Sequence, residues 1–281
     1  MSATFHLCID ETGEFEYQLG GAGDSRVGGY LCADDVYRNV WPRLAVHIAA
    51  LAAKDARFAP FAGRDSYHFT EMLGEENGYA FAKALVPFFE GERLELFISG
   101  GRVPFSIHPQ QAYGCTLLAL IAGIAAEAKL QDRCNKLRIM IASRIPVLSG
   151  TQRKSLTAYV TAMTAELRSQ IEAIPGLAGI ALEIEFGNAA EREDLMLADI
   201  VVGLMRKKDF AKMLAFRNVP VSDYFTQYLG APLPGIVGKL VERKLDREAC
   251  SVLLDAAASG GNVDKLDELL APIVRRILAG G

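Results

Sequence analysis

The chain has 281 residues, 51% of them hydrophobic, which is enough for the core of one large domain with or without a smaller appendage. Its 30 Lys and Arg residues and 34 Asp and Glu residues give a formal net charge of −4, so the overall basic surface of a protein that coats nucleic acid is excluded. The five cysteines are scattered and odd in number, which predicts free thiols in a reducing compartment and no Cys-x-x-Cys zinc site.

The N-terminal residues lack the basic segment of a secretory signal peptide. The longest apolar stretch, from about Leu117 to Ala128, is too short to span a membrane and is typical of a buried helix. We therefore expect a cytoplasmic protein without a membrane partner.

Hydrophobic periodicity predicts strands and helices in alternation along most of the chain. The predicted strands are Phe5–Ile9, Val27–Ala33, Leu94–Ser99, Leu137–Ala142 and Ile180–Phe186, with a short extended segment at Tyr67–Phe69. The predicted helices are Asp34–Ala53, Asn77–Phe89, Tyr113–Lys129, Thr151–Ile174 and the segment that contains Asp199, followed from about Val219 by short helices. This order of elements predicts an α/β fold.

Two adjacent acids, Asp10 and Glu11, directly follow the first strand. Acids at the C-terminal tip of a strand are a common way to hold a divalent metal ion. Because adjacent strand residues face opposite sides, Asp10 is the better candidate, since Glu11 shares its face with Leu7 and Ile9. The alternative is a solvated turn in which Asp10 bonds to its own backbone.

A third acid, Asp199, lies inside the apolar run Leu195–Met205, where a carboxylate is costly unless another group pairs with it. On a helix its neighbours one turn away are apolar or small, and Gly203 would let a backbone or a ligand approach closely. The acid therefore indicates either a metal or catalytic site or a structural ion pair, with Arg206 as one partner.

Other acids and one histidine are weaker candidates. Glu183 and Glu185 share one face of their strand, which predicts either an exposed sheet face or an additional metal ligand. His68 follows a polar loop and is the residue type best suited to proton transfer near neutral pH, although a lone loop histidine is more often structural.

A basic set follows Asp199 along the chain and consists of Arg206, Lys207, Lys208, Lys212 and Arg217. These side chains could contact phosphates at the rim of a site or complement a helix C-terminus. The acids Glu191, Glu193 and Asp194 open the Asp199 helix, where acids favour the helix dipole and capping is the expected role.

Three motifs occur in a defined order, namely Asp10-Glu11-Thr12-Gly13, His68-x-x-Glu71-Met72 and Leu197-Ala198-Asp199-x-x-x-Gly203. In this combination the chain resembles the domain-of-unknown-function family numbered 3800, whose members look like ribonuclease-H-like α/β domains. The resemblance implies a mixed sheet flanked by helices over residues 1–210, followed by a helical extension over residues 211–281.

The chain departs from the family pattern at three places. Thr12 stands where serine is usual, and Met196 or its neighbour takes the place of a glutamine. The strand Leu137–Ala142 continues into Ser143 without the aspartate that relatives often carry there. The missing acid puts a full metal-binding set in doubt.

In a ribonuclease-H-like fold, acids from the first strand and a late helix converge on Mg²⁺ or Mn²⁺. The resemblance thus implies a nuclease or phosphodiesterase with Asp10 and Asp199 as metal ligands. Glu11, counted among the catalytic residues, and Glu185 would be further ligands, and His68 would be a proton shuttle or phosphate contact.

Two other functions stay open. The missing strand acid is compatible with a degenerate, non-catalytic module that binds a protein or nucleic-acid partner. The acidic net charge favours a nucleotide over a polymeric substrate for the same metal site. Residues 211–281 are open to three roles, which are capping the sheet, restricting the site or forming a homodimer.

Overall fold

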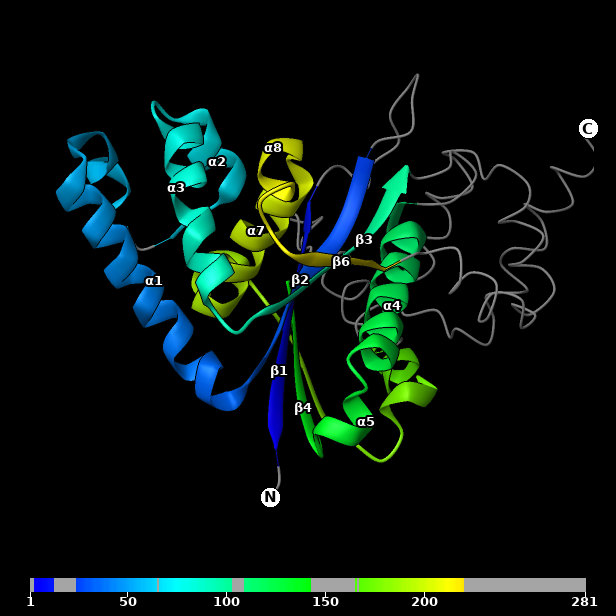
Figure 1. Ribbon diagram of the computed structural model, residues 1–281. Coiled ribbons are helices and arrows are strands. Elements are labelled where there is room, and N and C mark those ends of the chain that lie inside the picture. Colours follow the sequence, from blue (N-terminus) through cyan, green and yellow to red (C-terminus); the bar gives the residue numbers. More distant parts are fainter. Residues whose placement is uncertain are drawn as a thin grey trace, which may run out of the picture.

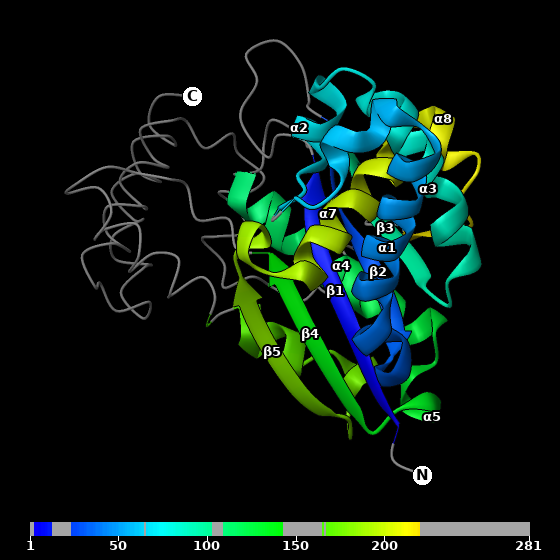
Figure 2. The ribbon, with the colours of Figure 1, turned by 90° about the vertical axis from the view of Figure 1, so that its left-hand side faces the viewer.

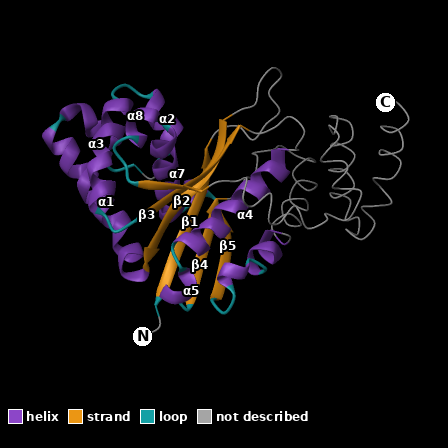
Figure 3. Cartoon of the chain, turned by 45° about the vertical axis from the view of Figure 1, so that its right-hand side comes forward, coloured by secondary structure: helices purple, strands orange, loops and turns teal. Residues whose placement is uncertain are grey.

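The computed structural model describes residues 3–12, 24–64, 66–102, 109–142, 165 and 167–219 of the chain. In these residues a six-stranded mixed sheet lies at the centre and helices cover both of its faces (Figures 1 and 3). The predicted α/β class is therefore confirmed. Most of the predicted helix Thr151–Ile174 and the helices expected after Val219 lie outside the described residues.

The strands are β1 Thr4–Thr12, β2 Asp24–Ala33, β3 Glu95–Arg102, β4 Lys136–Ala142, β5 Ala181–Gly187 and β6 Phe216–Val219. Their order across the sheet is β5-β4-β1-β2-β3-β6, which places β1 in the interior beside β4 (Figure 2). β2 is antiparallel to β1 and β3, whereas β4 runs parallel to both β1 and β5. The tip of β1 that carries Asp10 thus lies between two strands rather than at an edge.

The sheet extends beyond residue 210, the end predicted for the first domain, because β6 pairs in parallel with β3. This strand was not predicted. It has four residues, of which only Val219 is buried, so it is too short to show an alternating pattern. The rest of the predicted extension, from residue 220 on, lies outside the described residues.

The helices are α1 Asp34–Lys54, α2 Phe69–Gly74, α3 Gly78–Gly91, α4 Pro109–Glu127, α5 Leu130–Arg133, α7 Glu193–Arg206 and α8 Lys208–Ala211. Helices α1, α2, α3, α7 and α8 lie on one side of the sheet, and α4 and α5 lie on the other (Figure 1). The predicted extended segment Tyr67–Phe69 is wrong at its last residue, since Phe69 begins α2. No helix in the described part of the chain is both long and apolar enough to cross a membrane.

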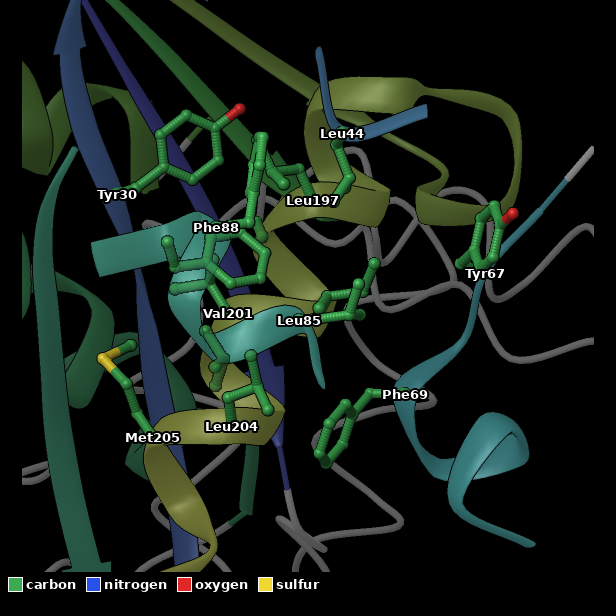
Figure 4. Packing of buried hydrophobic residues seen from close by; sticks show 14 of the residues in the cluster. Tyr30, Leu44, Tyr67, Phe69, Leu85, Phe88, Leu197, Val201, Leu204 and Met205 are labelled. Carbon is green, nitrogen blue, oxygen red and sulfur yellow. The ribbon is translucent and has the colours of Figure 1, made fainter. Parts of the chain in front are cut away.

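Alternation along β1 divides the core into two layers. Cys8 belongs to the cluster under α1, α3 and α7, whereas Leu7 and Ile9 belong to the cluster under α4. α7 packs on the sheet with its inner side and against α1 and α2 with other parts of its surface. Its side chains, among them Leu197 and Val201, are therefore buried on nearly all sides (Figure 4). Burial of each such side chain contributes about 1.5–3 kcal/mol, which explains the long apolar run.

Candidate functional site

Asp10 lies near the end of β1, on the face of the sheet that α7 covers. Its neighbour on this face, Cys8, is part of the core beneath α7, whereas Glu11 pairs across the sheet with Val27 of the opposite core. The prediction that these acids face opposite sides, with Asp10 apart from Leu7 and Ile9, is confirmed. The Oε2 atom of Glu11 is also buried.

A glycine in β2 brings α7 close to Asp10. Gly28 pairs with Asp10 in the sheet, and a Cβ atom on Gly28 would lie only 3.2 Å from Cγ2 of Val202. The helix therefore packs directly against the backbone at this point. Asp199 lies one turn before Val202, so the same close approach brings its carboxylate toward the tip of β1.

The carboxylate of Asp199 is held by the start of α2. Its Oδ2 atom accepts a hydrogen bond of 2.8 Å from the backbone N–H of Phe69. Nδ1 of His68 lies 3.5 Å from the same oxygen, at ion-pair distance. The structural pair of Asp199 with Arg206 is not observed, because Nη1 of Arg206 donates instead to Oγ1 of Thr12 at 3.3 Å.

Gly203 makes this arrangement sterically feasible. A Cβ atom on Gly203 would lie 2.0 Å from Cδ1 and 2.2 Å from Cγ of Phe69, so the ring packs directly on the helix backbone (Figure 4). The predicted close approach at Gly203 is confirmed, but the approaching group is a phenyl ring and not the backbone or ligand that was expected. The ring fixes the position of the N–H group that binds Asp199.

Electrostatics couples the two aspartates. Burial and the charge of Asp199 raise the pKa of Asp10 well above 3.8, and the bond of 2.7 Å from the Glu11 N–H to Oδ1 only partly offsets this. Asp10 is only 9% exposed. Interaction with the Asp199 carboxylate in turn raises the pKa of His68 above 6.5. The described site thus concentrates negative charge at a buried position.

Glu185 lies apart from this pair. It projects from β5 at the register of Met140 and Cys8, two strands from β1 and thus about 10 Å away across the sheet. Its carboxylate is 58% exposed and lies 3.0 Å from Nη1 of Arg192. Glu183 on the same strand pairs with Lys136 and Arg138, so an exposed sheet face describes both acids.

The structure therefore brings together Asp10, Asp199 and His68, and it separates Glu11 and Glu185 from them. Within the described ranges, no group of three or more His, Cys, Asp or Glu side chains is placed to hold a metal ion. A cation between Asp10 and Asp199 would have two carboxylate ligands, with its other positions open to water or substrate oxygens.

A buried polar network on the same face of the sheet was not predicted. Asp194 accepts hydrogen bonds from Arg192 and from the Tyr37 hydroxyl, the latter at 2.8 Å. His6 stacks on Tyr37 with ring centroids 3.7 Å apart, and its Nε2 atom lies 2.9 Å from Asp34. A pocket of about 290 Å³ adjoins this network, but its arginines already pair with acids. In the sequence Asp194 looked like an ordinary capping acid.

A second pocket, of about 250 Å³, lies beside the aspartate pair. Its lining includes Thr12, two residues beyond Asp10, and Gly203, one turn beyond Asp199. Arg206 and Lys207 also line it. Neither aspartate is among the described lining residues, so the basic residues at the end of α7 border a small space that adjoins the carboxylates through their chain neighbours.

Comparison of the chain with protein-family models, with curated proteins and with solved structures gives no match.

Proposed function

We propose that the chain is a divalent-metal-dependent phosphodiester hydrolase with a ribonuclease-H-like domain, as its motifs imply. The observation that carries this proposal is the close packing of α7 on β2 at Gly28, which places Asp199 on the same face of the sheet as the buried Asp10. Two carboxylates that repel each other at a buried position match the donor set of Mg²⁺, which is often bound by one or two carboxylates and completed by water and substrate phosphates. The mixed sheet flanked by helices supports the fold assignment.

Both aspartates are positioned through backbone donors. The N–H of Glu11 holds Oδ1 of Asp10, and the N–H of Phe69 holds Oδ2 of Asp199. Among the described residues, no hydrogen bond is observed to the second oxygen of either carboxylate, so that oxygen can take a ligand. A divalent cation bound there would lower the pKa of coordinated water and stabilise negative charge on a phosphoryl group.

His68 is suited to proton transfer at the rim. Its side chain is 34% exposed, so it can exchange protons with solvent, and Asp199 stabilises its protonated form. Glu11 faces the opposite side of the sheet, and Glu185 would have to leave Arg192 to join the site. Neither is therefore included in the proposed ligand set.

The test is Mn²⁺ binding, measured by electron paramagnetic resonance, together with hydrolysis of a chromogenic phosphodiester, RNA and DNA. Asp10→Asn and Asp199→Asn should each weaken Mn²⁺ binding at least about tenfold and abolish hydrolysis, because a neutral amide is a poor ligand for the ion. Asn at position 199 keeps an acceptor for the Phe69 N–H. The control is Glu193→Gln, an exposed acid on the same helix. Unchanged Mn²⁺ binding in both aspartate variants would refute the proposal.

A degenerate, non-catalytic module is the second candidate. The observations that favour it are the sequence after β4, where Ser143 stands in place of an aspartate, and the ion pair that engages Glu185. Under this hypothesis the purified chain leaves RNA, DNA and nucleotides intact in Mn²⁺ and still binds a partner. Cleavage that disappears in Asp10→Ala would eliminate it.

A further inference from the structure

The pocket of about 250 Å³ beside the aspartate pair has the lining of an anion site. Its polar side chains are those of Arg206, Lys207, Thr12 and Thr70, all of which can donate hydrogen bonds. The remaining described lining residues are apolar or glycine, namely Phe69, Leu73, Gly74 and Gly203. The described lining therefore contains two cations and no acid.

Arg206 differs from most other arginines in the described part of the chain. Most of them pair with carboxylates, as Arg192 does with Asp194. Within the described residues, neither Arg206 nor Lys207 lies at ion-pair distance from a carboxylate, and Arg206 contacts the Thr12 hydroxyl instead. A guanidinium and an ammonium group that line one pocket favour a ligand that carries several anionic oxygens.

The distance to the aspartates identifies the type of anion. Thr12, which Arg206 contacts, follows Asp10 by two residues on the same face of β1, a separation of about 7 Å. This spacing places the guanidinium of Arg206 beside the position proposed for an ion between Asp10 and Asp199. Phosphate oxygens both bind a divalent cation and accept hydrogen bonds from a guanidinium, so a phosphate in the pocket suits both neighbours.

We propose that this pocket binds a phosphate group of the substrate and that Arg206 and Lys207 are its binding residues. The inference rests on the proposed function, since it assigns the substrate side of the same site. The pocket is smaller than the roughly 300 Å³ at which sites for drug-sized ligands begin. It therefore accommodates a phosphate with part of an attached sugar, and the rest of a phosphate ester lies outside it.

The first experiment measures inorganic phosphate binding to the full chain by isothermal titration calorimetry without metal. Arg206→Gln and Lys207→Gln should each weaken binding by about tenfold or more, the effect of losing one hydrogen bond to a charged group. The matched control is Lys208→Gln, which removes an adjacent exposed cation outside the pocket lining. Lys207 is also exposed, so its variant should fold even if the loss of Arg206 from Thr12 disturbs the structure. The inference is overturned if phosphate does not bind at millimolar concentration, or if Lys208→Gln weakens binding as much as Lys207→Gln.

The second experiment adds Mn²⁺ and records the ³¹P resonance of bound phosphate. Paramagnetic broadening that disappears in Asp10→Asn, with phosphate affinity retained, supports one phosphate between the two groups. If the chain binds Mn²⁺ but neither Arg206→Gln nor Lys207→Gln changes its affinity for phosphate, the pocket assignment is overturned and the proposed metal site stands. If the chain binds phosphate through Lys207 but does not bind Mn²⁺, the pocket assignment stands and the metal site is refuted.

Competition then identifies the kind of phosphate. If adenosine 5′-monophosphate displaces inorganic phosphate but a dinucleotide without terminal phosphate does not, the pocket binds a terminal phosphate. If the dinucleotide also displaces it, the pocket binds an internal phosphodiester as well. If neither compound competes, the pocket does not bind a phosphate ester and the inference is wrong.

Discussion

Replacement of Gly203 by alanine tests the contact that positions Asp199. The new Cβ would lie 2.0 Å from Cδ1 of Phe69, whereas carbon atoms in contact prefer about 3.5–4.0 Å. The buried ring must therefore move by more than about 1 Å. Overpacking of this kind costs about 1–3 kcal/mol, and the overlap with two ring atoms favours the upper half of this range. Alanine also gains about 1 kcal/mol in helix propensity, so we expect a net loss of about 1–2 kcal/mol in the free energy of unfolding.

Urea unfolding, followed by far-UV circular dichroism, measures this loss. The control is Gly91→Ala, because this glycine also lies in a helix but a Cβ atom there would contact nothing within 4 Å. The control should gain up to about 1 kcal/mol. Equal or greater stability of Gly203→Ala relative to wild type would refute the proposed packing.

A double-mutant cycle then separates steric overlap from other effects of Gly203→Ala. Phe69→Ala alone should cost about 3–5 kcal/mol, because it removes a buried ring. In that background Gly203→Ala should no longer destabilise, which gives a coupling energy of about 1–3 kcal/mol. Gly203→Ala should also weaken Mn²⁺ binding, because the displaced ring carries with it the N–H that holds Asp199.

Burial lowers the pKa of His6 below 6.5, so the unfolded chain binds more protons than the folded chain just below that pH. The free energy of unfolding should therefore fall as the pH drops through this window. His6→Gln should flatten this slope of the unfolding free energy, measured by urea unfolding at pH values below 6.5, and a slope that persists would contradict the assignment. Arg192→Gln leaves the carboxylate of Asp194, which is 8% exposed, without its cation. In thermal unfolding, the variant should be about 2 kcal/mol less stable than wild type, which is less than for a fully buried pair because Arg192 is partly exposed. The control is Arg138→Gln, at an exposed arginine, which should cost under about 1 kcal/mol in the same assay. Ionised Asp10 destabilises the fold above pH 3.8, so Asp10→Asn should unfold at a higher temperature than metal-free wild type. Mn²⁺ at a hundred times its Kd should raise the free energy of unfolding of the wild type by about 2.7 kcal/mol, and a chelator should reverse this gain. The same Mn²⁺ concentration should not stabilise Asp10→Asn.

Elements with their own local pattern could be predicted from the sequence. β1 and α1 carry clear strand and helix signals, and both are present. α2 was missed because a helix of six residues is too short for a periodic pattern. Pairing of β6 with β3 depends on contact between segments more than a hundred residues apart, to which no local signal refers.

The site divides in the same way. Asp10 and Asp199 were predicted because each carboxylate interrupts an apolar pattern that the fold must bury. Glu185 has the side-chain direction expected from its strand, but the strand order places it two strands from β1, and this order cannot be read from alternation. The Phe69 N–H and the pocket between Thr12 and Arg206 depend on packing of α2 and β1 against α7, so no single segment contains a signal for them.

Two buried acids, Asp194 of α7 and Asp10 of β1, differ in how the fold compensates their charge. Asp194 is buried and is neutralised within the fold by Arg192 and Tyr37, an arrangement that lowers its pKa. At Asp10 burial raises the pKa most, and the charges that add to this rise are those of other carboxylates, above all Asp199. The chain thus supplies a guanidinium where a buried acid serves structure, and in the described residues it supplies none to Asp10. Replacement of such a buried charge by a neutral side chain would stabilise the fold, so a cation from solution that completes the site would give both acids a role.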